Sequence, residues 1–307
     1  MKLLFGQQTP PPLIGGCVAT IGNFDGVHSG HQALITELRA QANLRGLPVV
    51  VVFFEPQARD FLQGALAPNR IYRLREKILA LGACGVDYVY CIRFNHYTAN
   101  MSAVDFATQV LFLRLNIKYL LIGQDFRFGR ARRGDVALLQ QIGIEFDCRI
   151  ALLPTVNFRE QRVSSTDIRT ALTAGDLLLV KDLLARDYAF SARVVRGDGL
   201  ARQWGFPTAN LNLGRKKLPF TGVFCVRVKC AQSTWYNGVA NLGYRPTVAG
   251  VNPRVEIHIL DLNTSLYGER LEVVFLHKLR DEVKFPDVDA LIAQIHTDVA
   301  HARAYFK

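Results

Sequence analysis

The first half of the chain alternates short β-branched runs with longer segments in which apolar residues recur every three or four positions. The runs predict buried strands, and the spacing, as at Leu34, Ile35 and Leu38, predicts amphipathic helices. The predicted strands are residues 17–21, 49–54, 86–92, 119–122 and 148–153. The predicted helices are residues 32–45, 70–81, 103–115, 135–142, 167–174 and 177–185. This alternation predicts an α/β domain with a parallel sheet and helices on both faces.

From Tyr188 onward the hydrophobic pattern has a period of two. Short runs separated by Gly, Pro and Asn predict a small antiparallel sandwich or barrel. The predicted strands are residues 188–195, 223–229, 234–240, 254–260 and 271–276. An amphipathic helix is expected over residues 288–305. The change of period near Tyr188 places the domain boundary at 186/187, which gives domains 1–186 and 187–307.

Composition and charge indicate which kinds of binding partner these two domains have. Hydrophobic residues make up 50% of the 307 residues, and 37 Lys and Arg against 26 Asp and Glu give a net charge of +11. A basic surplus predicts anionic partners. Because the surplus is shared by both halves, it favours small phosphorylated ligands over a polyanion groove.

No targeting or cross-linking signal changes this picture. The chain has no apolar run near the roughly 20 residues that cross a bilayer and no signal-peptide core, so we expect a cytoplasmic protein without a membrane partner. The six cysteines form no C-x-x-C pair, which predicts free and mostly buried thiols.

The most informative loop, residues 22–31 (GNFDGVHSGH), connects the first predicted strand of this sheet to the first helix. At the carboxyl edge of a parallel sheet, a helix N-terminus offers unpaired N–H groups to a phosphate. His28 and His31, three residues apart, can then both stabilise charge on one phosphate. A metal pair is the alternative, but no third ligand with suitable spacing is evident.

This loop resembles the HxGH motif of the nucleotidylyltransferase superfamily, in the version found in bacterial FAD synthetases. Residues 123–129 (GQDFRFG) and 162–169 (RVSSTDIR) are similar to two further nucleotide and flavin segments of that family. The resemblance implies a Rossmann-like FMN adenylyltransferase domain in which His28 and His31 assist catalysis. The ATP- and FMN-binding residues that it implies are Gly22, Asn23, Phe24, Asp25, Gly26, Gly30, Asp125, Arg162, Ser164, Ser165, Thr166 and Arg169.

Ser165 and Thr166 also stand where a helix is expected to begin. Their hydroxyl and backbone N–H groups can hold phosphate oxygens, and Arg169, one turn later, adds positive charge. Taken alone, the hydroxyl groups fit equally well as simple helix caps.

In the second half, residues 205–210 (GFPTAN) resemble the PTAN motif of riboflavin kinases. Thr208 and Asn210 offer neutral oxygens, which suit Mg²⁺ bound with ATP, although such a sequence can also be an ordinary turn. Residues 238–247, 254–260 and 278–285 are similar to further segments of the same family. The kinase ATP- or flavin-binding residues that the resemblance also implies are Gly199, Asn241 and Arg280.

Glu256 matches the proposed base of the kinase family. On its predicted strand, Arg254, Glu256 and His258 share one face, so the carboxylate is held on a rigid element and can accept a proton from an attacking hydroxyl group. The alternative is a surface ion pair with Arg254 or Arg245.

Together the two motif sets are similar to the bifunctional bacterial riboflavin kinase and FMN adenylyltransferase family, from about Gly16 to Phe306. The resemblance implies a small β-barrel kinase domain with a C-terminal helix after the Rossmann-like domain. The implied substrates are riboflavin, FMN and ATP with Mg²⁺, and the products are FMN and then FAD. No nucleic-acid partner is expected, and the oligomeric state is left open.

Three residues depart from the family pattern: Gln57 stands where a histidine is frequent, and Ala201 and Trp204 precede the PTAN motif. One alternative is therefore an enzyme with a single live activity. A second alternative is a basic nucleic-acid-binding protein with a vestigial nucleotide fold, for which the isoelectric point near 9.5 and one arginine cluster give grounds. That cluster consists of Arg127, Arg130, Arg132 and Arg133.

Overall fold

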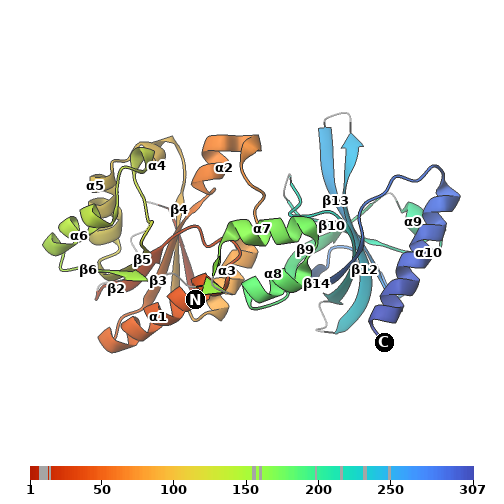
Figure 1. Ribbon diagram of the computed structural model, residues 1–307, viewed down its shortest axis with the longest axis horizontal. Coiled ribbons are helices and arrows are strands. Elements are labelled where there is room, and N and C mark those ends of the chain that lie inside the picture. The colour runs from red at the N-terminus through yellow and green to blue at the C-terminus, as the bar shows by residue number, and fades with distance from the viewer. Residues whose placement is uncertain are drawn as a thin grey trace. The chain divides into compact units, whose positions relative to one another are not determined.

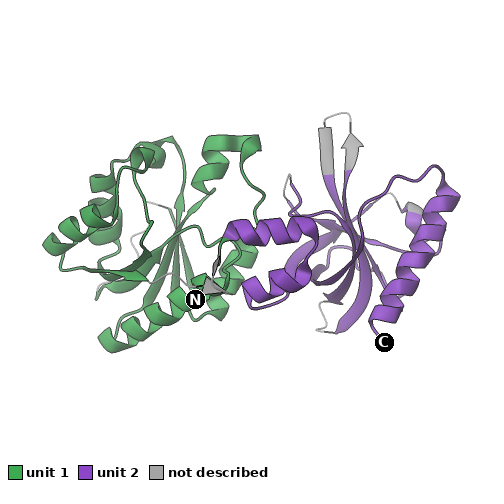
Figure 2. Ribbon diagram, in the orientation of Figure 1, with its two compact units in different colours: residues 1–164 green, residues 165–307 purple. Residues whose placement is uncertain are grey.

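The chain forms two compact units, residues 1–164 and 165–307 (Figure 2). In this computed structural model the described residues are 1–6, 13, 15–153, 157–158, 161–197, 199–214, 217–230, 234–247 and 250–307. The division falls before the predicted boundary at 186/187, because α7 (Ser165–Ala174) and α8 (Leu177–Leu184) group with the second unit. These helices pack on each other, and α8 packs on two strands of the barrel.

Unit 1 is built on a six-stranded parallel sheet with the order β1-β4-β3-β2-β5-β6 (Figure 1). Its strands are β1 (Lys2–Phe5), β2 (Cys17–Ile21), β3 (Val49–Glu55), β4 (Tyr88–Arg93), β5 (Ile117–Gly123) and β6 (Arg149–Leu153). The five predicted strands are confirmed. The edge strand β1 was not predicted, because four residues are too short to show a period.

Helices cover both faces of this sheet, as predicted. On one face, Ile35 of α1 (Ser29–Arg45) and Leu81 of α3 (Leu74–Ala83) pack against Val51. On the other face, Leu111 of η2 (Phe106–Arg114) and Leu139 of α6 (Val136–Glu145) pack in the cluster around Val52. The shorter elements are α2 (Ala58–Gln63), η1 (Gly64–Leu66), α4 (His96–Asn100), α5 (Ala103–Asp105), η3 (Arg130–Arg132), β7 (Asn157–Phe158) and β8 (Gln161–Arg162).

Unit 2 contains a closed antiparallel barrel with the strand order β10-β13-β12-β11-β14-β9. Its elements are β9 (Tyr188–Val195), α9 (Leu200–Gln203), β10 (Ala209–Asn212), β11 (Gly222–Lys229), β12 (Trp235–Thr247), β13 (Gly250–Ile259), β14 (Arg270–Arg280) and α10 (Val288–Tyr305). A barrel, rather than a sandwich, is thus the outcome of the alternation. Closure leaves no free sheet edge.

The barrel interior is filled by aromatic rings. Phe275 contacts Tyr188, Phe190, Phe220 and Phe224 at centroid distances of 5.2–6.0 Å. Outside the barrel, α10 covers a patch of the wall that includes Val223, Cys225 and Val239, and contributes Ala302 to it. The outward face of β12 and β13 beside this helix carries the polar residues described below.

All six cysteines are free, and four of them are buried. This confirms the prediction of unpaired thiols. Among the described residues, no helix is long and apolar enough to span a membrane.

Candidate active sites

The strand order of unit 1 places β2 between β3 and β5. The chain runs from β2 to β3 on one side and returns to β5 on the other, so the strand order reverses at β2 and β5. In open parallel sheets, ligands bind at the carboxyl ends of the strands at such a switch point. The loops that follow β2 and β5 are residues 22–28 and 124–134, and both carry predicted site residues.

His28 and His31 lie together where the first of these loops enters α1. His28 is the N-cap residue of α1, and its Nδ1 atom accepts a hydrogen bond of 3.4 Å from the backbone N–H of His31. The two imidazole rings stack at a centroid distance of 3.7 Å. The structure therefore brings the two predicted histidines to one helix N-terminus, where a phosphate would meet both rings and the N–H groups of the first helical turn.

Phe24 and Asp25 support this loop from inside the protein. The Phe24 ring is 1% exposed and lies 4.9 Å from the His31 ring. The Asp25 carboxylate is equally buried and accepts hydrogen bonds of 3.1 and 3.0 Å from the backbone N–H groups of Ile71 and Tyr72. Their side chains hold the loop in place, and direct binding of ATP or FMN by Phe24 and Asp25 stays a prediction.

The loop backbone is held in an unusual conformation. Phe24 and Val27 adopt positive φ angles of 49° and 45° although neither is glycine, and Gly26 has a φ of 80°. The carbonyl of Val27 accepts a 3.0 Å hydrogen bond from the Gln32 side chain, which helps to keep this shape. Strain of this kind is typical of ligand-binding loops.

Buried polar atoms gather near the ends of β2 and β3. Ser29 Oγ, Glu55 Oε2 and Gln57 Nε2 have no hydrogen-bond partner among the described residues. Gln57, the departure from the family histidine, is 6% exposed and precedes α2. A neutral glutamine at this position can still donate a hydrogen bond from this amide to a phosphate or flavin.

A buried lysine lies on α3, beyond the residues that the motifs indicated. Lys77 is fully buried, and its Nζ atom lies 4.5 Å from the centre of the Phe53 ring. Burial lowers the pKa of its ammonium group, against the attraction of the Asp25 and Glu55 carboxylates. No sequence pattern singles out Lys77, because a lysine in an amphipathic helix is usually on the solvent face.

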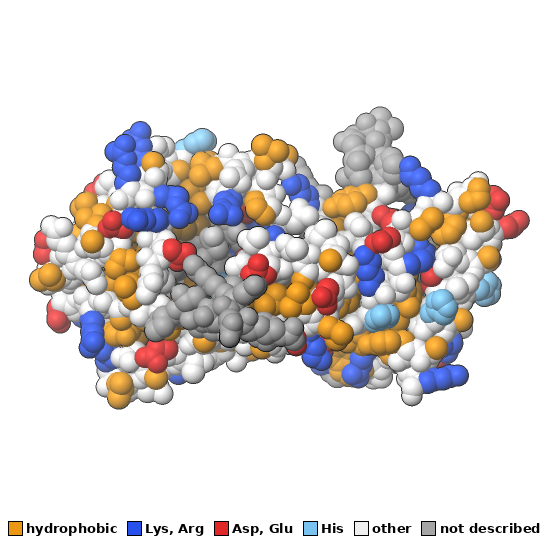
Figure 3. Space-filling model, in the orientation of Figure 1, with side chains coloured by type: hydrophobic (Ala, Val, Ile, Leu, Met, Phe, Trp, Pro, Cys, Tyr) orange, Lys and Arg blue, Asp and Glu red, His pale blue; other side chains and the backbone are white. Residues whose placement is uncertain are grey.

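The loop after β5 exposes Asp125 and the arginine cluster. Arg127 pairs with Asp135 at 2.9 Å, while Arg130, Arg132 and Arg133 are exposed. On the face shown in Figure 3, Lys and Arg side chains lie in several separate groups and do not form one continuous groove. This distribution agrees with the scattered charge expected from the sequence.

Residues 162–169, which resemble a nucleotide-binding segment of the family, cross the division between the units. Ser164 ends unit 1, and Ser165 begins α7 in unit 2, followed by the exposed Thr166 and the half-buried Arg169. The backbone of Arg162 belongs to β8, whereas its side chain is outside the described residues. Phosphate binding by this signature therefore stays a prediction. Asn23 is exposed and Gly22 and Gly30 are half-buried beside the histidines.

In unit 2, four predicted kinase residues lie in one row across the barrel. Glu256 on β13 pairs with Asn210 on β10 and with Asn241 on β12. Asn241 in turn pairs with Val223, which pairs with Arg280 on β14. Residues directly opposite each other in an antiparallel sheet point to the same face. Because Val255 and Ile257 point inward, Asn210, Glu256 and Asn241 point outward.

Glu256 forms the ion pair that the sequence left as an alternative. Arg254 Nη2 lies 2.7 Å from Glu256 Oε1, and 18% of the Glu256 side chain is exposed. The pair restrains the carboxylate next to Asn210 and Asn241. An ion pair and a role as base are thus compatible in this arrangement.

The segment between β9 and α9 packs closely on Asn210. A Cβ atom added to Gly197 would lie 2.3 Å from Asn210 Nδ2, so only glycine fits there. Gly199 has a φ of 73° with open space around it, and Thr208 is half-buried two residues before Asn210. Thr208 and Asn210 are therefore presented on the same short segment.

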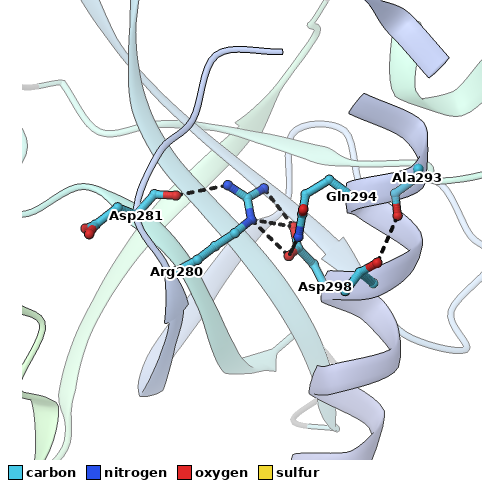
Figure 4. Close-up of polar contacts among 6 residues, drawn as sticks. Arg280, Asp281, Ala293, Gln294 and Asp298 are labelled. Carbon is cyan, nitrogen blue, oxygen red and sulfur yellow. Dashed lines mark hydrogen bonds and ion pairs between the residues drawn. The ribbon is translucent and has the colours of Figure 1, made fainter. Parts of the chain in front are cut away.

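Arg280 is anchored to the C-terminal helix (Figure 4). Its Nε and Nη2 atoms donate to the Asp298 carboxylate at 2.8–3.1 Å, and Nη1 donates to the Asp281 carbonyl at 2.9 Å. Asp298 is 4% exposed and also accepts a 2.9 Å hydrogen bond from Gln294. Arg280 thus ties β14 to α10, and contact with a flavin or ATP stays a prediction. Sequence reasoning missed Asp298, which nothing distinguishes from an ordinary helix-surface acid.

The side chains available as metal ligands indicate which kind of ion could bind. Among the described residues, no group of three or more His, Cys, Asp or Glu side chains could hold a metal ion. The neutral oxygens of Thr208 and Asn210 instead suit a hard cation that shares its ligands with a phosphate chain.

Comparisons with known proteins find relatives of both halves of the chain. The FAD synthetase family model matches residues 11–167, and the riboflavin kinase family model matches residues 184–306. The chain is 46% identical over 310 residues to the bifunctional riboflavin kinase/FMN adenylyltransferase of Escherichia coli K12, covering 100% of this chain and 98% of the relative. It is 42% identical to the Haemophilus influenzae protein of the same description, covering 100% and 99%.

A solved structure from Streptococcus pneumoniae, described as a macrolide-efflux protein, has the same architecture. It superimposes with a TM-score of 0.80 at 30% identity and covers 97% of this chain and 98% of its own. With two family models in the predicted order and relatives matched along their full length, the chain belongs to the bifunctional riboflavin kinase/FMN adenylyltransferase family.

Proposed function

We propose that the two activities of this enzyme reside at separate sites, the kinase on the outer wall of the barrel and the adenylyltransferase at the loop between β2 and α1. The observation that carries the proposal is the row of Asn210, Glu256 and Asn241 on three adjacent strands. Three segments far apart in the sequence thereby present one carboxylate and two amides on a single surface.

At the barrel site, Glu256 accepts the proton of the riboflavin 5′-hydroxyl group as that oxygen attacks the γ-phosphate of ATP, giving FMN and ADP. Thr208 and Asn210 would hold Mg²⁺, which neutralises charge on the phosphates when bound. Asn241, next to Glu256, hydrogen-bonds substrate. Phosphoryl transfer depends mainly on positioning, and these side chains lie on a rigid wall.

At the loop of unit 1, the phosphate of FMN is already ionised and needs no base. It attacks the α-phosphate of a second ATP, and pyrophosphate leaves. His28 and His31, together with the N–H groups at the start of α1, stabilise the charge that develops on the α-phosphate. Gln57 and Asp125 lie in the segments after β3 and β5 and would contact the substrates.

Substitutions at each site test this division. Glu256→Gln should lower FMN formation by at least about a hundredfold while FMN supplied directly is still converted to FAD, and His28→Ala should do the reverse. Glu272→Gln, on an exposed position of β14, and His301→Ala, on an exposed position of α10, are matched controls. Loss of both activities in a folded single variant would contradict the two-site assignment.

The two alternative functions, an enzyme with one live activity and a nucleic-acid-binding protein, predict different experimental results. If Gln57 has silenced the adenylyltransferase, riboflavin, ATP and magnesium will yield only FMN. If Ala201 or Trp204 has silenced the kinase, riboflavin will yield neither FMN nor FAD, while supplied FMN will still yield FAD. If the exposed arginines Arg130, Arg132 and Arg133 bind nucleic acid, an oligonucleotide will bind with steep salt dependence. Small-molecule substrates alone predict no such binding.

The proposal includes two further expectations, and the oligomeric state is left to measurement. The functional boundary is placed at 186/187, and the family models, which end at 167 and begin at 184, leave most of α7 and α8 outside both. A cytoplasmic location is expected from the sequence. Size-exclusion chromatography would give the oligomeric state.

A further inference from the structure

A histidine joins the strand that carries Glu256 to the turn that carries Thr208. His258 Nδ1 lies 3.0 Å from the carbonyl oxygen of Pro207. A carbonyl oxygen can only accept, so Nδ1 carries the proton in this contact. The Pro207 carbonyl belongs to the same peptide group as the N–H of Thr208, and its orientation therefore sets the orientation of the Thr208 backbone.

The strand ladder does not reach this turn. The pairing of β10 with β13 covers Ala209 with Ile257 and Asn210 with Glu256, and it stops there. Pro207 has no N–H group with which to continue the ladder. The His258 side chain supplies the missing link one residue beyond the last backbone pair.

Aromatic contacts hold the same turn from a second side. The Phe206 ring is 8% exposed and meets His258 edge-to-face at a centroid distance of 5.5 Å. It meets His296 of α10 in the same way at 4.7 Å. The turn is thus fixed between β13 and α10, with the Pro207 carbonyl facing β13.

We propose that His258 is a positioning residue of the kinase, which holds the Pro207–Thr208 peptide against β13 and so keeps Thr208 beside Asn210 and Glu256. The inference rests on the proposed binding of Mg²⁺-ATP by Thr208 and Asn210. Without this hydrogen bond, the Phe206 ring still contacts the His258 side chain, but no polar contact recorded among the described residues fixes the Pro207 carbonyl to β13. The oxygen of Thr208 then loses its fixed place, while the carboxylate of Glu256 keeps its own.

Three variants of His258 in the full chain test the role of the Nδ1 donor. Asn places its amide donor near the position of Nδ1, Gln places it near the position of Nε2, and Ala removes it. His258→Ala and His258→Gln should raise the Mg²⁺ concentration for half-maximal FMN formation, and KM for ATP, about five- to tenfold. His258→Asn should stay within about twofold of the wild type.

Other readouts separate positioning from general stability. KM for riboflavin, kcat at saturating Mg²⁺ and the conversion of supplied FMN to FAD should all stay within about twofold of the wild type, and His301→Ala should change nothing. The proposal is overturned if His258→Ala leaves the Mg²⁺ dependence unchanged. It is also overturned if His258→Asn shows the same altered Mg²⁺ dependence as His258→Ala. A third contrary result is that His258→Ala and His258→Gln change kcat and KM for riboflavin by factors as large as their change in the Mg²⁺ dependence.

If His258→Ala does not fold, the other two variants of His258 decide the outcome. His258→Asn and His258→Gln differ by one methylene group, and equal Mg²⁺ dependence in the two would overturn the proposal. Thr208→Ala and Asn210→Ala test the underlying metal site. If neither shifts the Mg²⁺ dependence, the assignment of the metal ligands fails. If both shift it and His258→Ala does not, only the role of His258 fails.

Discussion

Two buried acids, Asp25 and Asp298, support groups of the two proposed sites from within the protein. Asp25 fixes the loop of His28 by accepting two backbone hydrogen bonds, and Asp298 holds Arg280. Neither acid stands out in the sequence as a support, because buried and surface acids occupy the same helical and loop patterns. At the scale of residues, motifs located the groups proposed for chemistry and missed the groups that position them.

Lys77 gives a prediction about pH. Its pKa in the folded protein is lowered by burial below the ordinary value of 10.5, so unfolding takes up protons in the interval between the two values. Stability then rises with pH across that interval. The unfolding temperature of the wild type should therefore rise relative to that of Lys77→Met as the pH is raised from 7 to 10.

An exposed lysine of the same unit provides the control. Lys2→Met should run parallel to the wild type over the same pH range, because Lys2 is exposed in the folded protein. If the wild type and Lys77→Met also run parallel, burial does not lower the Lys77 pKa. Differential scanning fluorimetry at half-unit pH steps is sufficient.

At the scale of elements, α10 is attached to the barrel by an apolar patch and two ion pairs of different burial. The pair of Arg280 with Asp298 has side-chain exposures of 21% and 6%, whereas the pair of Arg303 with Asp261 has exposures of 47% and 72%. Removing one partner of a buried pair leaves an uncompensated charge, while exposed pairs contribute little. The two pairs thus provide a matched comparison on one helix.

Asp298→Ala should destabilise unit 2 by about 3 kcal/mol and lower the temperature at which FMN formation is lost. Asp261→Ala should leave thermal unfolding unchanged. Conversion of supplied FMN to FAD at low temperature serves as the internal reference for both variants. Equal effects of the two substitutions would show that burial of the pair is not what anchors α10.

The elements that the sequence pattern predicted are those with a clear period. The strands around Val18 and Val51 and the helix over 288–305 are present as predicted. β10 was missed because two of its four residues are asparagine, a poor strand former. The domain boundary was placed by the change of period at Tyr188, whereas α7 and α8 group with the barrel through packing that no local pattern records.

At the scale of the whole molecule, the six cysteines are distributed over both units and none of them forms a disulfide. Burial raises the pKa of Cys91 and Cys148 to about 12 and that of Cys225 to about 11, and it also raises the pKa of Cys17. Only the thiolate form reacts with electrophiles. The four buried thiols are therefore protonated and shielded at neutral pH.

Titration with a thiol reagent at pH 8 tests this distribution. The native enzyme should react rapidly at no more than the half-buried Cys84 and Cys230, and all six thiols should react in denaturant. Mass spectrometry of the labelled peptides identifies the sites. Rapid labelling of Cys17 or Cys225 in the native enzyme would show that its part of the core opens readily.

The outward row of Asn210, Glu256 and Asn241 alternates along each strand with inward residues such as Ile257 and Leu242. Neighbouring codons are therefore under different selection, one for chemistry and the next for packing. A library that randomises the codons of Asn210, Glu256 and Asn241, and spares the outward Val239 that α10 covers, changes the reactive surface and leaves the aromatic interior intact. Substrate preference in this barrel can evolve by surface substitutions that require no compensating change in the core.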